Sequence, residues 1–213
     1  MRMLPSTHSA MPARAWPGAA RALLCLFASA CVAPDAGAVF TSAYVSGSYS
    51  MTVQVGSAAV IDQVDFNVTG NNAGLTPAPV TGTNTSTGAS GVTIRVTPNR
   101  PLTAFESHPV TVTVDSSIAL SCTTPANCGS TAIPFSTISW TSTDATSPNQ
   151  GDIQSGTFSG SATQQIARYE AATGFLDAAT RFMSNTRNFQ YANSTVYPAG
   201  QYRGTVRFTA TMV

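Results

Sequence analysis

The sequence has no lysine and little charge of either sign. All ten of its basic residues are arginines, which face nine acidic residues, and charged residues make up 9% of the chain. Nucleic acids and anionic membranes are bound through clusters of positive charge, which this composition does not supply. We therefore expect neither partner. Ser, Thr, Gly and Asn occupy the surface positions that Lys and Glu usually fill, which is typical of exported β-proteins and disfavours long helices.

Residues 1–38 differ from the rest of the chain and are predicted to be a secretory signal. Arginines precede an apolar run at residues 22–33, which is too short to be a permanent membrane span. The Ala-Gly-Ala tripeptide at residues 36–38 fits the small-x-small cleavage rule. We expect a mature chain of residues 39–213 that forms one domain, lacks a transmembrane segment and lies in the periplasm or at the cell surface. The alternative is a lipid anchor at Cys31, because small residues precede this cysteine as they do in bacterial lipoprotein signals.

Cysteine is scarce outside the predicted signal. Only Cys122 and Cys128 remain in the mature chain. An even pair in an exported protein predicts one disulfide that closes a short loop, with a contribution of roughly 2 kcal/mol to stability. Two thiols are too few for a zinc site, and His108, the one mature histidine, is not at a ligand spacing from them. We expect no metal and no cofactor.

Catalytic motifs are lacking as well. The chain contains no Gly-x-Ser-x-Gly elbow that would make His108 the base of a serine hydrolase. Asp62 and Asp65 point to opposite faces of one predicted strand, so they do not form the carboxylate pair of a glycosidase. Neither a phosphate-binding glycine loop nor a calcium-binding loop is present. No catalytic residue is assigned, and we expect a protein that is not an enzyme.

Alternation of apolar and polar residues recurs along the whole mature chain. It predicts roughly eight short strands separated by turns rich in Gly, Pro and Asn, and hence an all-β fold, an antiparallel immunoglobulin-like β-sandwich. Trp140 shares the parity of Ile138 and is assigned to the core. Residues 163–181 depart from the pattern because Ile166 and Tyr169 are at helical spacing. We expect a short helical turn or irregular crossover there, with a pair of short edge strands as the alternative. The alternating segments are residues 45–55, 60–68, 92–96, 110–114, 118–120, 138–140, 189–191 and 202–212.

The last of these segments alternates most regularly. Its apolar face is expected to lie in the core, while the arginines and threonines between these positions face solvent. The predicted core positions of this strand are Tyr202, Gly204, Val206, Phe208, Ala210 and Met212.

Residues 197–210 carry a family resemblance. They are similar to the closing Ala-Gly-x-Tyr-x-Gly-x-Val-x-Phe strand of secreted bacterial surface proteins related to chaperone-usher pilins and to the spore coat U type, and Gly200 is fourteenth from the end, as in many pilins. Two features depart from that family. The cysteines are close in sequence, whereas the family's disulfide joins distant strands, and Met212 replaces the penultimate aromatic residue.

The resemblance implies an incomplete sheet that is filled first by a periplasmic chaperone and then by a strand from a neighbouring subunit. The candidate donor lies at residues 44–55, with Val45, Tyr49, Met51 and Val53 as its donor-side residues. In the alternative, both segments pair within one chain and form a self-sufficient monomer.

We therefore expect an exported, non-enzymatic surface or structural protein, pilin-like or adhesin-like, whose partners are itself or other surface subunits. The alternative function is a periplasmic or extracellular module that binds carbohydrate or another envelope polymer through the loop at residues 81–91 and exposed aromatic residues.

Overall fold

The chain folds into antiparallel β-sheets. The computed structural model describes residues 41–45, 49–56, 62–74, 76–99, 109–143, 152–171 and 181–212, all of which lie within the unit Ala36–Val213. Every strand pairing in these ranges is antiparallel. The all-β class predicted from the alternating segments is therefore confirmed.

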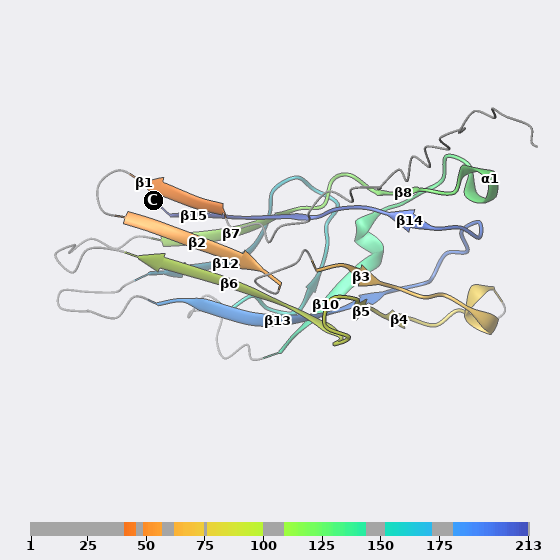
Figure 1. Ribbon diagram of the computed structural model, residues 1–213, viewed down its shortest axis with the longest axis horizontal. Helices are drawn as coiled ribbons and strands as arrows, with labels where there is room; N and C mark the ends of the chain where they lie inside the picture. The colour runs from red at the N-terminus through yellow and green to blue at the C-terminus, as the bar shows by residue number, and fades with distance from the viewer. Residues whose placement is uncertain are drawn as a thin grey trace, which may run out of the picture. The chain divides into compact units, whose positions relative to one another are not determined.

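The largest sheet has seven strands. Its strands β2, β6 and β13 lie side by side in Figure 1. Their order is β1-β2-β6-β13-β10-β11, and the short strand β4 also pairs with β13. Long strands alternate in burial along their length, so one side of each faces the core. The strands of this sheet are β1 (Thr41–Val45), β2 (Tyr49–Val55), β4 (Val80–Thr81), β6 (Gly91–Asn99), β10 (Ile138–Thr143), β11 (Gly156–Thr157) and β13 (Met183–Tyr191).

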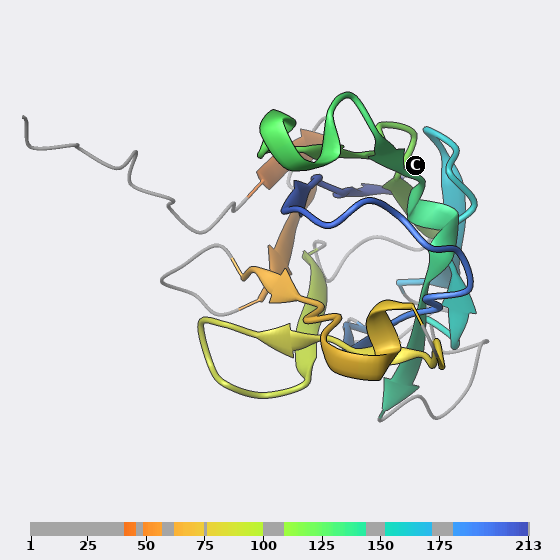
Figure 2. The same ribbon diagram turned by 90° about the vertical axis from the view of Figure 1, so that its right-hand side faces the viewer.

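Three smaller sheets complete the fold. One has the order β12-β7-β15, the second β14-β8-β9, and the third pairs β3 with β5. Figures 1 and 2 show the carboxy-terminal strand β15, in dark blue, beside β7. The elements are β3 (Val64–Asp65), η1 (Gly70–Ala73), β5 (Thr83–Asn84), β7 (Pro109–Asp115), β8 (Leu120–Cys122), α1 (Pro125–Cys128), β9 (Ala132–Ile133), η2 (Phe135–Thr137), β12 (Gln164–Glu170), β14 (Tyr202–Arg203) and β15 (Arg207–Met212).

Buried side chains of the seven-stranded sheet and of the sheet β12-β7-β15 form one core cluster. Trp140 belongs to this cluster, as its parity predicted, and its indole Nε1 donates a hydrogen bond of 2.8 Å to the carbonyl of Gln154. The cluster removes a large apolar area from water, which is the main term that stabilises a domain of this size. Its members on the longest strands are Met51, Val53, Val92, Ile94, Val96, Val110, Val112, Val114, Ile138, Trp140, Ala167, Tyr169, Met183, Phe189, Tyr191, Ala210 and Met212.

For residues 163–181 the predicted helical turn or irregular crossover is wrong where the structure describes the segment, and the described part is an edge strand, as in the alternative. Residues 164–170 form strand β12, which pairs with β7. The register shifts between Gln165 and Ala167, so Ile166 is an extra residue in the ladder. Because of this bulge, Ile166 and Tyr169 both pack against the core although they are three residues apart. Inward residues three apart are also typical of a helix, which explains the wrong prediction. Residues 172–180 lie outside the described ranges.

The strand count and two strand boundaries also differ from the prediction. Fifteen strands appear in the described ranges, of which several have only two or three residues, whereas roughly eight were expected. Ile118 was placed on the inward face of a strand but is 75% exposed, and β8 begins two residues later at Leu120. The segment predicted at 60–68 is described from residue 62 onward, and within residues 62–68 only Val64–Asp65 pairs as a strand, although Phe66 is half-buried.

Candidate functional site

Strand β15 lies at the end of its sheet. In the order β12-β7-β15 it has one hydrogen-bonded neighbour, β7, among the residues that the structure describes. The two strands pair residue for residue, from Arg207 opposite Asp115 to Met212 opposite Val110. An antiparallel edge strand directs alternate backbone N–H and C=O groups away from its neighbour. Among the residues that the structure describes, no strand is hydrogen-bonded to the outer edge of β15.

The other edge of the same sheet is different. Strand β12 carries the bulge at Ile166 and two charged residues, Arg168 and Glu170. Bulges and charges are the devices by which proteins prevent edge-to-edge pairing. Strand β15 has no bulge in its register with β7, and its one charged residue, Arg207, is at its beginning. Of the two edges, β15 is the one better suited to accept a strand.

The side chains of β15 alternate as the sequence predicted. Ala210 and Met212 are buried and Phe208 is half-buried, whereas Thr209 and Thr211 are exposed. One face of the strand therefore belongs to the core and the other to solvent. The inward face fixes the strand in place without occupying its outer edge.

The predicted terminal strand is interrupted at residues 204–206, so that β14 and β15 belong to different sheets. Glycine at position 204 allows the chain to approach the buried ring of Phe135. A Cβ at Gly204 would lie 2.9 Å from Cζ of Phe135 and 3.1 Å from the Cα of Leu120. Gly204 was predicted to lie in the core but is exposed, because the strand is interrupted here, and Tyr202 and Val206 on either side of it are half-buried.

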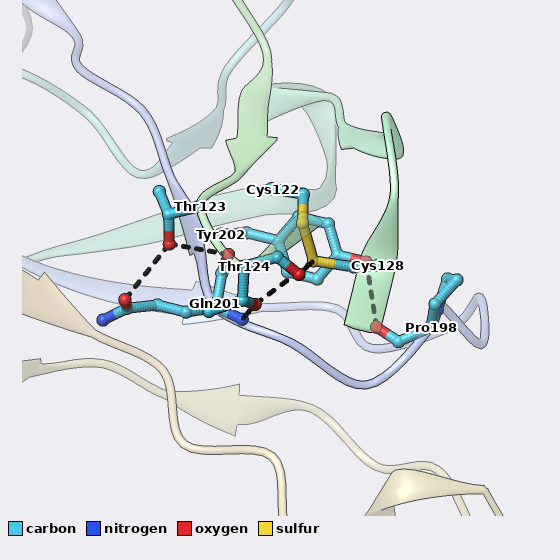
Figure 3. The surroundings of a disulfide bond; sticks show 7 residues. All are labelled: Cys122, Thr123, Thr124, Cys128, Pro198, Gln201 and Tyr202. Carbon is cyan, nitrogen blue, oxygen red and sulfur yellow. Dashed lines mark hydrogen bonds between the residues drawn. A yellow bond between two sulfur atoms is a disulfide. The ribbon is translucent and has the colours of Figure 1, made fainter. Parts of the chain in front are cut away.

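A disulfide joins Cys122 and Cys128 at the start of this terminal segment (Figure 3). Their Cα atoms are 6.0 Å apart, and the bond closes a loop that includes α1. Cys122 pairs with Tyr202 in the ladder between β8 and β14. Gly200 lies against the buried Cys128, since a Cβ at this position would clash with its Sγ. The disulfide loop thus packs directly on the chain that leads into β15.

Hydrogen bonds strengthen this attachment. The backbone N–H of Thr123 donates to the carbonyl of Gln201 at 2.7 Å, and the N–H of Gln201 donates to Oγ1 of Thr124 at 3.1 Å. The Tyr202 hydroxyl donates to the carbonyl of Pro198 at 2.9 Å. Figure 3 shows the bonds of Gln201 to Thr124 and of Tyr202 to Pro198 around the disulfide, together with two bonds that the Thr123 hydroxyl donates to the carbonyl and Oε1 of Gln201. These bonds hold residues 198–202, which lead into the pairing of β14 with β8.

The predicted donor segment pairs with its own chain. Met51 and Val53 are buried in β2, which lies between β1 and β6. Val45 and Tyr49 are partners across the β1–β2 hairpin. This is the arrangement of the within-chain alternative. The structure brings Met51 and Val53 into the same core cluster as Ala210 and Met212.

A polar group that the sequence analysis missed lies inside the core. Arg187 on β13 is 1% exposed, and its Nη1 donates a hydrogen bond of 2.8 Å to Oγ of Ser142. Its Nη2 has no hydrogen-bond partner within the described ranges. Burial lowers the pKa of Arg187 to about 10, against the opposing effect of the Asp152 carboxylate. The guanidinium therefore remains charged at neutral pH in an apolar environment.

Neighbouring polar contacts tie the chain after β10 to β13. The N–H of Ile153 donates to Oδ1 of the buried Asn185 at 3.1 Å, and Nδ2 of Asn185 donates to Oδ1 of Asp152 at 3.2 Å. Ser142 Oγ donates to the carbonyl of Ile153. Burial alternates strictly from Met183 to Tyr191, but Asn185 and Arg187 occupy two of the buried positions, so a search for alternating apolar residues did not detect the middle of this strand.

Arg187 also borders a gap in the core, whose lining includes Trp140, Phe158 and Phe208. The gap has no room for a water molecule. It is a packing defect beside the guanidinium and not a ligand pocket.

The residues considered for catalysis do not assemble into a site. His108 lies outside the described ranges. Asp115 accepts hydrogen bonds from the hydroxyl and the N–H of Ser117, and these bonds lower the pKa of its carboxyl group. In the described ranges no three His, Cys, Asp or Glu side chains are grouped as metal ligands.

No protein-family model, curated protein or solved structure matches this chain. The likeness to pilins thus stays a prediction from residues 197–210. Across the described ranges, no helix is both long and apolar enough to cross a membrane.

Proposed function

We propose that this protein is an exported, non-enzymatic subunit of a bacterial surface structure, and that it assembles by adding a strand to the outer edge of β15. In this proposal the seven-stranded sheet and the sheet β12-β7-β15 are the two layers of an immunoglobulin-like sandwich. The observation that carries the proposal is the contrast between the two edges of the smaller sheet. The edge strand β12 has a bulge and two charged residues, whereas the edge strand β15 pairs with β7 in an unbroken register.

The chemistry of strand addition fits what β15 offers. Affinity in this mode comes from main-chain hydrogen bonds along an extended edge, and no catalytic group is needed. The added strand belongs to a neighbouring subunit, a second copy of the chain or another surface protein. By resemblance to pilins, a periplasmic chaperone covers the same edge before assembly.

The direct test is residue-resolved hydrogen exchange on the mature chain. In the monomer, alternate amides between residues 207 and 212 should exchange rapidly because they point away from β7. In purified multimers the same amides should be protected. Protection of all these amides in the monomer, or rapid exchange that persists in multimers, would contradict the proposal.

A matched pair of variants separates edge addition from other modes of association. Thr209→Lys places a charge on the edge strand, and Thr113→Lys places the same charge on the residue directly opposite, in the central strand β7. The edge variant should form fewer multimers in size-exclusion chromatography with light scattering, and the central variant should resemble wild type. Equal effects would mean that association uses the face of the sheet and not its edge.

A further inference from the structure

The outer face of the seven-stranded sheet is polar but almost uncharged. Strands β2, β6, β10 and β13 contain no acidic residue and only two arginines, Arg95 and Arg187. Arg187 points into the core and is buried, so Arg95 is the one charged side chain that these four strands expose. Neighbouring strands in a sheet are about 4.8 Å apart, so the four strands make a face about 14 Å across.

Hydroxyl and amide groups form rows across this face. In one row Gln54 on β2 lies opposite Arg95 on β6, which lies opposite Ser184 on β13. In the next row Thr93, Thr186 and Thr143 lie on β6, β13 and β10. The hydroxyls of Thr93 and Thr186 are 3.0 Å apart. Each hydroxyl or amide group both donates and accepts hydrogen bonds.

One aromatic ring stands beside these rows. Phe182 immediately precedes β13 and is 56% exposed. The Cζ of Arg95 lies 5.2 Å from the centre of its ring, which is within the range of a cation–π contact. The contact holds an exposed ring and a guanidinium with several donors at the end of the hydroxyl rows. An exposed aromatic residue in an uncharged polar surface has no evident role in the core or in the edge at β15.

We propose that this face, with Phe182 and Arg95 at its end, binds a neutral polysaccharide. Sugar rings combine an apolar face, which suits an aromatic ring, with hydroxyls that suit the Thr, Gln and Arg side chains. The charge of the face selects the partner, because these four strands offer a polyanion a single exposed cation and offer a polycation no carboxylate. The site is distinct from β15 and does not depend on the assembly proposed above. It also differs from the loop at residues 81–91 that the sequence suggested.

Affinity electrophoresis of the mature chain provides the test. Native gels would contain hydroxyethylcellulose, dextran or laminarin as neutral glucans, and alginate as an anionic comparison. At least one neutral glucan should retard wild type more than alginate does. Phe182→Ala should weaken the binding about tenfold, because it removes the aromatic contact. Arg95→Gln should weaken it as well, since it removes the guanidinium donors.

Arg168→Gln is the matched control, because Arg168 is exposed on β12 in the other sheet. It should bind as wild type does. Circular dichroism would confirm that each variant is folded. If Phe182→Ala does not fold, Arg95→Gln still tests the site. The proposal is overturned if no neutral glucan retards wild type, if only alginate does, or if the control loses as much affinity as the two site variants.

Discussion

Replacing Arg187 by methionine is expected to stabilise the protein. The side chain is 1% exposed, one of its two terminal nitrogens has no hydrogen-bond partner within the described ranges, and Asp152 offers only partial compensation. Charges in such surroundings are often replaced by apolar residues of similar volume with a gain in stability. Methionine has a similar length and adapts to irregular space, so it suits the gap beside Trp140 and Phe158.

The expected gain follows from two opposing terms. The pKa of about 10 corresponds to a penalty of roughly 3 kcal/mol for the charged form in the core. Methionine loses the hydrogen bond to Ser142, and a bond to a charged group contributes about 1.5–3 kcal/mol. Ser142 keeps its bond to the carbonyl of Ile153. The net gain is therefore about 1 kcal/mol.

Urea unfolding at pH 7 measures this difference. Because the folded-state pKa of Arg187 is depressed, the folded protein carries the full penalty below about pH 10 and is relieved of it as the pH rises further. The gain of Arg187→Met should accordingly be complete at pH 7 and should shrink in strongly alkaline solution.

Arg187→Ala is the matched variant for packing. It removes the same charge but leaves a cavity, so it should be about 2–5 kcal/mol less stable than Arg187→Met. The reasoning is refuted if the methionine variant is less stable than wild type by more than about 1 kcal/mol. That result would mean that the guanidinium stabilises the core through contacts stronger than the single bond to Ser142.

Three further changes have defined outcomes. Replacing Cys122 and Cys128 by serine should lower the free energy of unfolding by roughly 2 kcal/mol. It should also speed amide exchange at Thr123, whose N–H is bonded to the terminal segment. Unchanged exchange would mean that the disulfide does not hold that segment. Tyr169→Phe should leave stability equal or raise it by up to about 1 kcal/mol, since the buried hydroxyl has no hydrogen-bond partner within the described ranges. A lower melting temperature in thermal unfolding would mean that the hydroxyl does have a partner. Gly204→Ala should cost about 1–3 kcal/mol in urea unfolding, because the added methyl meets a buried ring and a backbone atom, and a neutral result would show that the ring can move.

Local alternation predicted most of what depends on one strand at a time. The inward positions Phe208, Ala210 and Met212 were found because apolar residues mark them without interruption. Strand β13 was recognised only at its end because Asn185 and Arg187 occupy inward positions in its middle. A pattern of apolar residues cannot reveal a strand whose core positions are polar.

Other features depend on contacts between distant segments, which local patterns do not contain. The bulge at Ile166 exists only relative to β7, and without that partner the segment has the spacing of a helix. The face that includes Arg95 and Phe182 joins residues from separate strands, and its low charge becomes visible only when those strands are placed side by side. The position of β15 at a sheet edge is likewise a property of strand order.

The contacts that hold β15 in place affect how tightly another strand can bind to its edge. Binding to a mobile edge would lose affinity because the edge must first be ordered. Here the core fixes the inward side chains of β15, and the disulfide loop holds the preceding chain through Gly200 and Gln201. Neither attachment uses the outer backbone groups of the strand. Under the proposed assembly, the edge is ordered before a partner arrives, so its main-chain hydrogen bonds contribute to affinity with little ordering cost.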